Sequence, residues 1–403
     1  MPSYSGVWNL VAQYQAKAQG LWPQGPGAPT SVTALGGDTQ ATISFTAPTF
    51  TGVPPGIIQY RAISSPGGIT TTGASSPLTV AGLTNGTPYT FSVDATNGIG
   101  FGPSGVSNSV TPVLPRGLFA GGVPPSGPDL NTINYITIST TGNAIYFGDL
   151  TARCNSQASC SFGTWGVFAG GIINSSISSG MQYVNIESTG NSFNFGNLTN
   201  SVYALAGLAN STRGVFAGGA GGTVTNVIQY ITQFGGNAID FGDLSQGVVG
   251  LAACASPTTG LFAGGENQGG SRTSSIQQIT INSTGNSTNF GNLTASRTDF
   301  AGCSSSTRGI FAGGFGYISQ IQFVTIASGG DATNFGNLLT GNQNLAACSS
   351  QTRGVFGGGN EVGTRTNTIQ YVTIASTGNA IDFGDLVSPR QSTASCSNAH
   401  GGL

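Results

Sequence analysis

A short glycine-rich segment that recurs along residues 116–403 constrains the fold of this chain more than any other feature. It reads Gly-Leu-Phe-Ala-Gly-Gly at residues 117–122, and close variants begin at residues 166, 214, 260, 309 and 354. The six starts are 49, 48, 46, 49 and 45 residues apart. A period of this length excludes ankyrin, tetratricopeptide and leucine-rich repeats, and it is typical of β-propeller blades. A β-solenoid is the alternative, although solenoid coils are usually shorter.

Each repeat contains the pattern of four short strands. In the repeat from Arg297 to Leu338 we expect strands at residues 300–304, 309–314, 321–326 and 332–338. Turn residues separate these segments, so each repeat predicts one antiparallel meander. The first strand is built from Ala, Gly, Ser and Cys, whereas the last carries Phe and Leu. Small side chains suit strands that converge on one axis, and large ones suit the wider outer spaces between blades.

The two ends of the repeat region complement each other. The region begins at a second strand, residues 117–119, and it ends with a lone first strand within residues 391–398. This C-terminal strand can complete the first blade, which would remove two open sheet edges. We therefore predict a six-bladed β-propeller over residues 116–403 of an all-β chain.

Several repeat positions are similar to those of kelch propellers. They are the double glycine that ends the second strand and an arginine shortly before the first strand, at Arg153, Arg297 or Arg390. Other aromatic residues replace the Tyr and Trp of the kelch family's later strands, namely Tyr135, Tyr230, Phe323, Tyr371, Phe147, Phe195 and Phe383. The repeat region thus resembles a kelch-type propeller with substituted aromatic positions.

Residues 27–113 carry a different pattern, in which short strands alternate with turns. Segments at residues 41–45, 57–62 and 89–95 belong to it, and about seven such strands predict an antiparallel sandwich. The loop Leu83-Thr84-Asn85-Gly86-Thr87-Pro88-Tyr89 resembles the tyrosine corner of fibronectin type III modules. This resemblance implies that the Tyr89 hydroxyl bonds to nearby backbone and that Phe45 replaces the family's core tryptophan.

The first 26 residues form a short lead that ends in Pro23-Gln24-Gly25-Pro26. Its apolar side chains recur at spacings of three or four, which favours a short amphipathic helix. One interpretation is that this segment folds back onto the next domain. The other interpretation is a docking peptide that becomes ordered when it binds a partner. The candidate docking residues are Trp8, Val11, Tyr14, Leu21 and Trp22.

The chain is unusually poor in charge. Charged residues make up 6% of it, against about 25% in ordinary soluble domains, and the net charge is −2. Since nucleic-acid binding depends on clustered Lys and Arg, no such partner is expected. Neither a membrane-spanning apolar run nor a signal peptide is recognisable. A nearly neutral surface associates easily, which suits a copy packed into a larger assembly or a homo-oligomer.

The sequence offers little for catalysis or metal binding. Its only histidine is His400, near the C-terminus, so Ser-His-Asp and copper-oxidase sites lack ligands. Asp149, Asp243 and Asp385 are replaced by Asn in other repeats, and we interpret them as turn residues. Five of the six cysteines share one repeat position, and Cys154 is the exception. We expect buried, unpaired cysteines, no metal, no cofactor and no enzymatic activity. A glycosidase carboxylate pair stays open as an alternative.

The connections between the second and third strands vary, while the sequences that flank them stay constant. By the symmetry of a propeller, all six emerge on one face. Variable loops with aromatic and arginine side chains on a constant scaffold favour recognition. The alternative is that these loops differ because nothing selects their sequence. The candidate ligand-face residues are Glu266, Arg272, Phe315, Tyr317, Glu361 and Arg365.

Taken together, the modules resemble the modular virion proteins of tailed bacteriophages. An apolar N-terminal segment, a fibronectin type III-like spacer and a repeat domain follow one another. The resemblance implies a tail or capsid fibre of an extracellular particle, in which residues 1–26 bind other virion proteins. The loop face would then meet a host glycan or receptor. The alternatives are a bacterial cell-surface adhesin or filament subunit, and a purely capsid-decorating protein.

Overall fold

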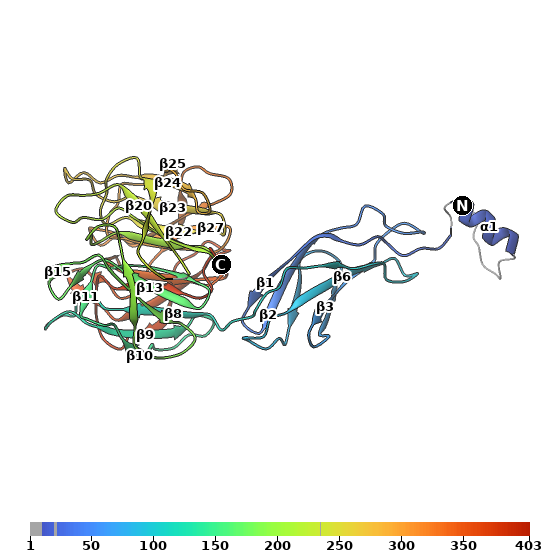
Figure 1. Ribbon diagram of the computed structural model, residues 1–403, viewed down its shortest axis with the longest axis horizontal. Helices are drawn as coiled ribbons and strands as arrows, with labels where there is room; N and C mark the ends of the chain where they lie inside the picture. Colours follow the sequence, from blue (N-terminus) through green and yellow to red (C-terminus); the bar gives the residue numbers. More distant parts are fainter. Residues whose placement is uncertain (1–9, 20–21, 234) are drawn as a thin grey trace. The chain divides into compact units, whose positions relative to one another are not determined.

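The computed structural model describes residues 10–19, 22–233 and 235–403. The chain divides into two compact units, Met1–Leu114 and Pro115–Leu403. Both units are built of β-strands, and the helix α1 (Leu10–Ala18) precedes the strands of the first unit (Figure 1). Within the described residues, no helix has the length and apolar character needed to cross a bilayer.

In the described part of the first unit, seven strands form two antiparallel sheets. One sheet has the order β1-β2-β5 and the other β4-β3-β6-β7. The strands are β1 (Thr30–Gly37), β2 (Gln40–Thr46), β3 (Gln59–Ser65), β4 (Thr70–Gly73), β5 (Leu78–Ala81), β6 (Thr90–Thr96) and β7 (Gly105–Val106). β3 begins two residues later than expected, at Gln59.

Alternate residues of these strands form the core between the two sheets. Ile43 of β2 and Phe91 of β6 are completely buried. Phe45, in the place of the expected tryptophan, is also buried. The backbone N–H of Thr84 donates to the Tyr89 hydroxyl over 3.2 Å, as the resemblance to a tyrosine corner implies. The unit is therefore held by an apolar core and by one aromatic hydroxyl that fixes a loop.

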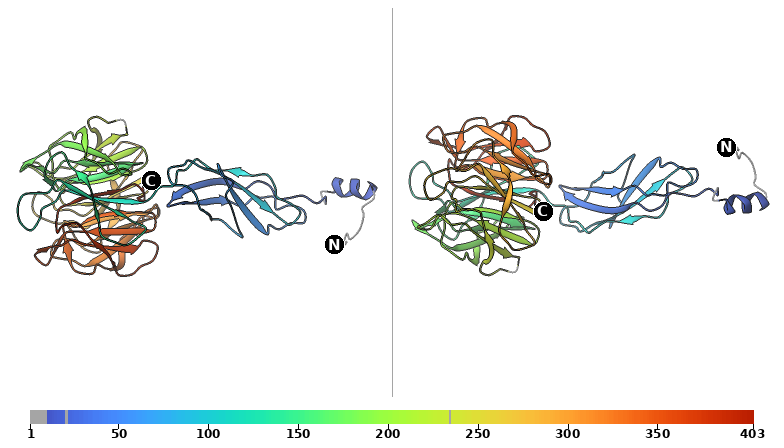
Figure 2. Two further views of the ribbon diagram at one scale, coloured as in Figure 1. Left: turned by 90° about the horizontal axis from the view of Figure 1, so that it is seen from below. Right: turned by 90° about the horizontal axis from the view of Figure 1, so that it is seen from above.

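In the described residues, the second unit is built around six antiparallel sheets of four strands, one for each repeat, and two small three-stranded sheets lie in its loops. Figures 1 and 2 show this unit from three sides. We number the strands of each sheet from one to four, starting with the strand that precedes the glycine-rich segment. The first sheet takes its strand one from the C-terminus, since β37 pairs with β8.

The 24 main strands are named sheet by sheet, and within each sheet they run from strand one to strand four. Sheet one has β37 (Ala394–Ser397), β8 (Arg116–Ala120), β9 (Thr132–Thr137) and β10 (Ile145–Asp149), and sheet two has β12 (Ala158–Phe162), β13 (Trp165–Ala169), β16 (Gly180–Asn185) and β17 (Phe193–Asn197). Sheet three has β18 (Ala206–Ala209), β19 (Arg213–Ala217), β20 (Val227–Thr232) and β21 (Ile239–Asp243), and sheet four has β22 (Ala252–Ala255), β23 (Thr259–Ala263), β24 (Ser275–Thr280) and β25 (Thr288–Asn292). Sheet five has β26 (Ala301–Ser304), β27 (Arg308–Ala312), β28 (Gln320–Thr325) and β29 (Thr333–Asn337), and sheet six has β31 (Ala346–Ser349), β32 (Arg353–Gly357), β35 (Thr368–Thr373) and β36 (Ile381–Asp385).

Strand one of each sheet packs against the first glycine of the recurring segment in the next sheet. A Cβ added to Gly309 would lie 2.5 Å from Sγ of Cys254, and one added to Gly117 would lie 2.5 Å from Sγ of Cys348. The other four pairs are Cys396–Gly166, Cys160–Gly214, Leu208–Gly260 and Cys303–Gly354. Only glycine leaves room for these side chains. All six cysteines are buried and unpaired, as expected, and burial raises the pKa of Cys348 to about 12.

A cycle of six backbone hydrogen bonds connects the segments that lead into the six first strands. The N–H of Ser156 donates to the carbonyl of Ser392, and that of Ala204 donates to Ser156. The same pattern continues from sheet to sheet, with N···O distances of 2.8–2.9 Å throughout. Each member has φ between +50° and +69°. We term these residues the axial ring: Ser156, Ala204, Gly250, Asp299, Asn344 and Ser392.

A second set of hydrogen bonds joins the outer parts of neighbouring sheets. In the turn between strands three and four of sheet two, Gly190 donates its N–H to the carbonyl of Phe147 in sheet one, over 2.9 Å. The side-chain Oδ1 of the next residue, Asn191, accepts from the N–H of Asp149 over 2.9 Å. Equivalent Gly and Asn or Asp residues join every other pair of neighbouring sheets.

These outer contacts correct the interpretation of three acids as turn residues. Asp149, Asp243 and Asp385 end their fourth strands. Each donates its backbone N–H to an asparagine side chain of the next sheet. Because only the backbone makes this contact, Asn serves equally well at the position, which explains the alternation of Asp and Asn.

The three arginines that precede strand one do not all occupy equivalent positions. In each sheet, the second glycine of the recurring segment donates its N–H to one carbonyl of the following connection, and Arg297, Arg390 and Cys154 are equivalent acceptors. Arg153 is one residue off this position and is exposed. The two buried arginines donate to backbone carbonyls of their own sheets. Burial lowers the pKa of each to about 10.

A buried glutamine in strand three links each of sheets two to six to the preceding sheet. Its Oε1 accepts a backbone N–H over 2.7–2.9 Å from the residue that follows the last leucine of that sheet. The five glutamines are Gln182, Gln229, Gln277, Gln322 and Gln370. Sheet one has the shorter Asn134, which is fully buried and whose side-chain N and O atoms both lack a partner.

Asn134→Gln is therefore expected to raise the free energy of unfolding by about 1 kcal/mol, the usual net contribution of a hydrogen bond. The longer side chain would supply the acceptor for the N–H of Val387 that the other sheets already have. The matched reverse change, Gln277→Asn, should lower the free energy by a similar amount. Urea denaturation measures both. Destabilisation by Asn134→Gln would mean that the amide is not the missing link.

Gly309→Ala should destabilise the second unit by about 1–3 kcal/mol, because the new methyl group would overlap the Cys254 thiol. Cys254→Ala removes that thiol, so the double variant should lose less stability than the sum of the two single variants. A double-mutant cycle on unfolding free energies measures this coupling. Strict additivity would show that the two residues do not share the space between the sheets.

Candidate functional site

The loops between strands two and three lie at the same end of the sheets as the axial ring, because strand two ends and strand one begins there. Short pairings tie these loops to the ring-bearing connections. Glu266 pairs with Val249, and β33 (Asn360–Glu361) pairs with β30 (Asn342–Gln343). The corresponding loop of sheet two belongs to a separate small sheet, which joins β11 (Cys154–Asn155), β14 (Ile172–Ile173) and β15 (Ser176–Ile177). We term this end the loop face.

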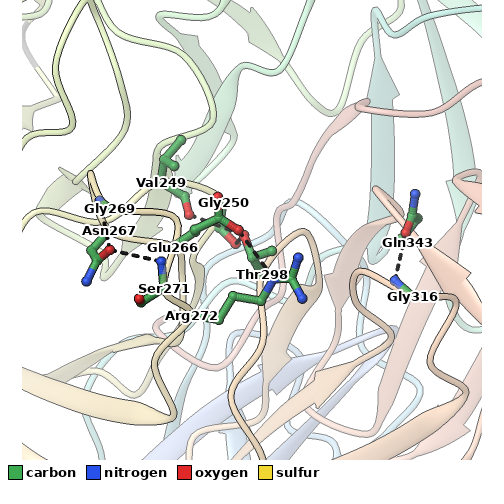
Figure 3. Close-up of polar contacts among 10 residues, drawn as sticks. All are labelled: Val249, Gly250, Glu266, Asn267, Gly269, Ser271, Arg272, Thr298, Gly316 and Gln343. Atoms are coloured by element: carbon green, nitrogen blue, oxygen red, sulfur yellow. Dashed lines mark hydrogen bonds and ion pairs between the residues drawn. The ribbon is translucent and has the colours of Figure 1, made fainter.

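The loop of sheet four is a hairpin held by one asparagine. Oδ1 of Asn267 accepts hydrogen bonds from the N–H groups of Gly269 and Ser271, both over 3.0 Å (Figure 3). Glu266 and Arg272 pair across the hairpin, and Nε of Arg272 lies 3.3 Å from Oε2 of Glu266. The hairpin therefore presents a partly exposed ion pair in a fixed position.

Arg272 also reaches the neighbouring loop of sheet five. Its guanidinium carbon lies 3.9 Å from the centroid of the Phe315 ring, which is the geometry of a cation–π contact. Phe315 is 48% exposed, and its N–H donates to the carbonyl of Thr298 over 2.9 Å. An acid, a cation and an aromatic ring from two loops thus form one exposed cluster, which we term the Arg272 cluster.

The axial ring forms the floor of a cavity of about 110 Å³ beside this cluster. Asp299, Asn344 and two serines of the ring contribute polar side chains to it. Burial raises the pKa of the Asp299 carboxyl, and the charge of Glu266 raises it further, while Arg272 lowers it. The cavity is therefore polar, and its one carboxyl accepts a proton more readily than an exposed aspartate does.

The ligand-face residues predicted from sequence lie in the loops of three adjacent sheets. Glu266, Arg272 and Phe315 form the Arg272 cluster. The hydroxyl of Tyr317 lies 4.0 Å from the position of a Cβ added to Gly363, so the loops of sheets five and six adjoin. Gly316 also donates its N–H to Oε1 of Gln343, over 3.0 Å (Figure 3). Glu361 and Arg365 lie on the facing strands β33 and β34 (Thr364–Arg365), and burial raises the pKa of Glu361.

The predicted docking segment is described in part, because Trp8 and Leu21 lie outside the described residues. Val11 and Tyr14 lie on α1 and are 65% and 76% exposed. Trp22 follows the helix and is partly exposed. Together with Leu10 and Ala18, Val11 and Tyr14 form an apolar strip along one side of the helix.

The last residues of the chain occupy the other end of the space between the first strands. Gly401 donates its N–H to the carbonyl of Ser304 over 3.0 Å. Gln351 donates from Nε2 to the carbonyl of His400 over 3.0 Å. A Cβ added to Gly402 would lie 1.8 Å from the carbonyl oxygen of Ala209, so only glycine fits there. The tail thus contacts sheets three, five and six, and it borders a cavity of about 60 Å³ lined mostly by small side chains.

The single histidine holds this tail in place through hydrogen bonds of its ring. Nε2 of His400 lies 2.8 Å from the carbonyl of Ser161, and Nδ1 accepts the N–H of Gly402 over 3.1 Å. A neutral ring protonated on Nε2 satisfies both contacts, and burial lowers the pKa of the imidazole. In the described part of the chain, no three His, Cys, Asp or Glu side chains lie close enough to hold a metal ion.

Sequence reasoning missed two parts of these surfaces. The six members of the axial ring share a backbone conformation but no residue type, so nothing in the repeat marks them. The role of the C-terminal tail was missed as well, although Gly401-Gly402 was an available signal. Paired glycines at a chain end indicate close backbone approach.

His400 should make the stability of the second unit depend on pH. Its pKa is lowered on folding, so the folded chain binds fewer protons and stability is greatest above the ordinary histidine pKa of about 6.5. Stability should fall as the pH drops from there toward the folded pKa, because a proton on Nδ1 would face the N–H of Gly402. The measurement is the free energy of unfolding of the wild type minus that of His400→Gln, between pH 8 and pH 5. A difference that does not change with pH would contradict this role.

Comparison with known protein families identifies a domain in one part of the chain. The model of the fibronectin type III domain matches residues 27–111. No curated protein matches the chain. The chain is thus all-β, and its first unit contains a fibronectin type III domain.

Proposed function

We propose that the chain is a structural protein of a tailed-bacteriophage particle, a tail or capsid fibre, which displays a closed six-bladed propeller of the kelch type to a host surface. The axial ring supports the closed form, since its hydrogen bonds run from each sheet to the next and return to the first. A rigid ring of sheets is a suitable carrier for recognition loops.

The Arg272 cluster is the observation that carries the recognition role. It places a cation, an acid and a half-exposed aromatic ring on one surface, held by hydrogen bonds from two loops. The chain enters the second unit at the opposite end of the sheets, because the N–H of Arg116 donates to Oδ1 of Asn398 beside the tail. In this proposal, the loop face meets a host glycan or receptor. No catalytic activity is proposed, and the only histidine serves the tail.

The apolar strip of α1 supports attachment to a particle. A helix with Val11 and Tyr14 largely exposed gains stability when another protein covers these side chains. In this proposal, other virion proteins bind residues 1–26, and the fibronectin type III domain separates that attachment from the propeller.

The test of attachment compares two double variants, one within α1 and one at its C-terminal end. Val11→Asp with Tyr14→Asp should remove the chain from purified particles, because it places two charges on the apolar strip. Lys17→Asp with Gln19→Asp adds acids at exposed positions outside the strip and should leave the chain on the particles. Sedimentation of particles in a density gradient, followed by detection of the chain, measures both. Attachment of the first double variant would overturn the docking role of α1.

The test of recognition uses Arg272→Ala with Phe315→Ala on assembled particles. We expect binding to cells of the propagating strain to weaken at least about tenfold, which corresponds to about 1.4 kcal/mol. The amount of chain on the particles should not change. Unchanged cell binding would favour a purely decorating role. Detection of the chain on bacterial cell surfaces in the absence of particles would favour an adhesin.

A further inference from the structure

Five of the six sheets fill the same surface position with a stacked pair of side chains. In sheets one, three, five and six, an arginine at the start of strand two lies over an aromatic ring of strand three, with 4.6–5.0 Å between the guanidinium carbon and the ring centroid. These arginines also donate to backbone carbonyls of the next sheet. In sheet two, Trp165 stacks on Tyr183 with ring centroids 4.5 Å apart.

Sheet four departs from this rule at both positions of the pair. Thr259 stands in place of the arginine, and Gln278 stands in place of the aromatic residue. Opposite Gln278 across strands three and four lies Thr288, where most of the other sheets carry Ile or Phe. Three large side chains are thus replaced by small or polar ones at adjacent places.

The result is a groove of about 290 Å³ in sheet four. Thr259, Gln278 and Thr280 form one part of its lining, and the turn from Ser283 to Asn286 forms another. The groove lies at the end of the sheet opposite the loop face, because strand two begins there and strand three ends there. It is therefore separate from the Arg272 cluster.

We propose that this groove binds one unit of a neutral saccharide. Its lining consists almost entirely of hydroxyl and amide side chains, which donate and accept hydrogen bonds, and it contains no charged side chain. An ionic ligand would find no counter-charge there, and an apolar ligand would bury polar groups without partners. The volume lies near the lower end of about 300–1,000 Å³ for small-molecule sites, which suits a single sugar ring.

The departure from the repeat also supports a functional origin. Loss of the stacked pair removes a cation–π or aromatic contact worth about 0.5–1.5 kcal/mol, and in four sheets it would remove the link between neighbouring sheets as well. Sheet four nevertheless keeps its glutamine link and its thiol–glycine contact. The change is therefore confined to the groove, and it opens a cleft that the other sheets fill.

Saturation-transfer NMR on the full chain tests this inference, with glucose, galactose, mannose, N-acetylglucosamine and N-acetylgalactosamine as probes. At least one of these sugars should receive saturation from the wild-type protein. Thr259→Arg with Gln278→Tyr restores the pair found in other sheets and should fill the groove, so this variant should lose the signal at least tenfold. The loop-face variant Arg272→Ala with Phe315→Ala should keep it.

A second variant is a control for the case in which the substitutions that fill the groove impair folding. Thr280→Val with Thr284→Val preserves side-chain shape and removes two exposed hydroxyl groups, so it should also weaken the signal. Absence of signal for every sugar, or a signal that survives both groove variants, would overturn the inference. Loss in the loop-face variant alone would place the sugar on the loop face, which would leave the proposed function standing and the groove without a role.

Discussion

In the second unit, no sheet satisfies all of its own backbone hydrogen-bonding groups, and the structure of the unit depends on the bonds between sheets. The connections into strand one, the second glycine after strand two and the turns before strand four all bond to a neighbouring sheet. In the axial ring, five residues other than glycine hold φ near +55°, a conformation that usually costs of order 1 kcal/mol or more for each residue. The hydrogen bonds of the ring offset that cost only while all the neighbouring sheets are in place, which makes the six sheets interdependent.

The parts of this fold that the sequence could predict are those that need a particular residue type. Gly309 and its equivalents recur because a thiol occupies the place of their Cβ, and Tyr89 is recognisable because its hydroxyl anchors a loop. The axial ring could not be predicted, since Ser, Ala, Gly, Asp and Asn all adopt its conformation. The exact position of Arg153 could not be predicted, because the connections before strand one share no residue type that fixes their alignment. On the loop face, the variable segments were recognisable. The contact of Arg272 with Phe315 was not, because it joins two repeats and no pattern within either repeat indicates it.

A repeated scaffold makes departures from the repeat informative, provided that each is weighed against the links between sheets. Asn134 breaks a link and leaves two buried polar atoms without partners, so it is a defect of the scaffold. Leu208 replaces a cysteine and keeps the packing on the next glycine, so it is neutral. Thr259 and Gln278 remove a surface pair and leave two of the links of sheet four to its neighbours in place. Only the last kind of departure opens a new surface while the glutamine link and the thiol–glycine contact stay in place, and it is therefore the departure on which the ligand proposal rests.

The scarcity of charge bears on how such surfaces could bind. With 6% charged residues, the chain has little long-range field to steer a partner, and its contacts should depend on salt far less than those of a basic protein. Hydrogen bonds and stacking at a shallow groove or loop cluster give modest affinity for one copy. A fibre that is present in several copies on one particle converts modest affinity into firm attachment, because each bound copy raises the effective concentration of the next. Weak, neutral recognition sites are thus consistent with the proposal that the apolar helix binds the chain to a larger assembly.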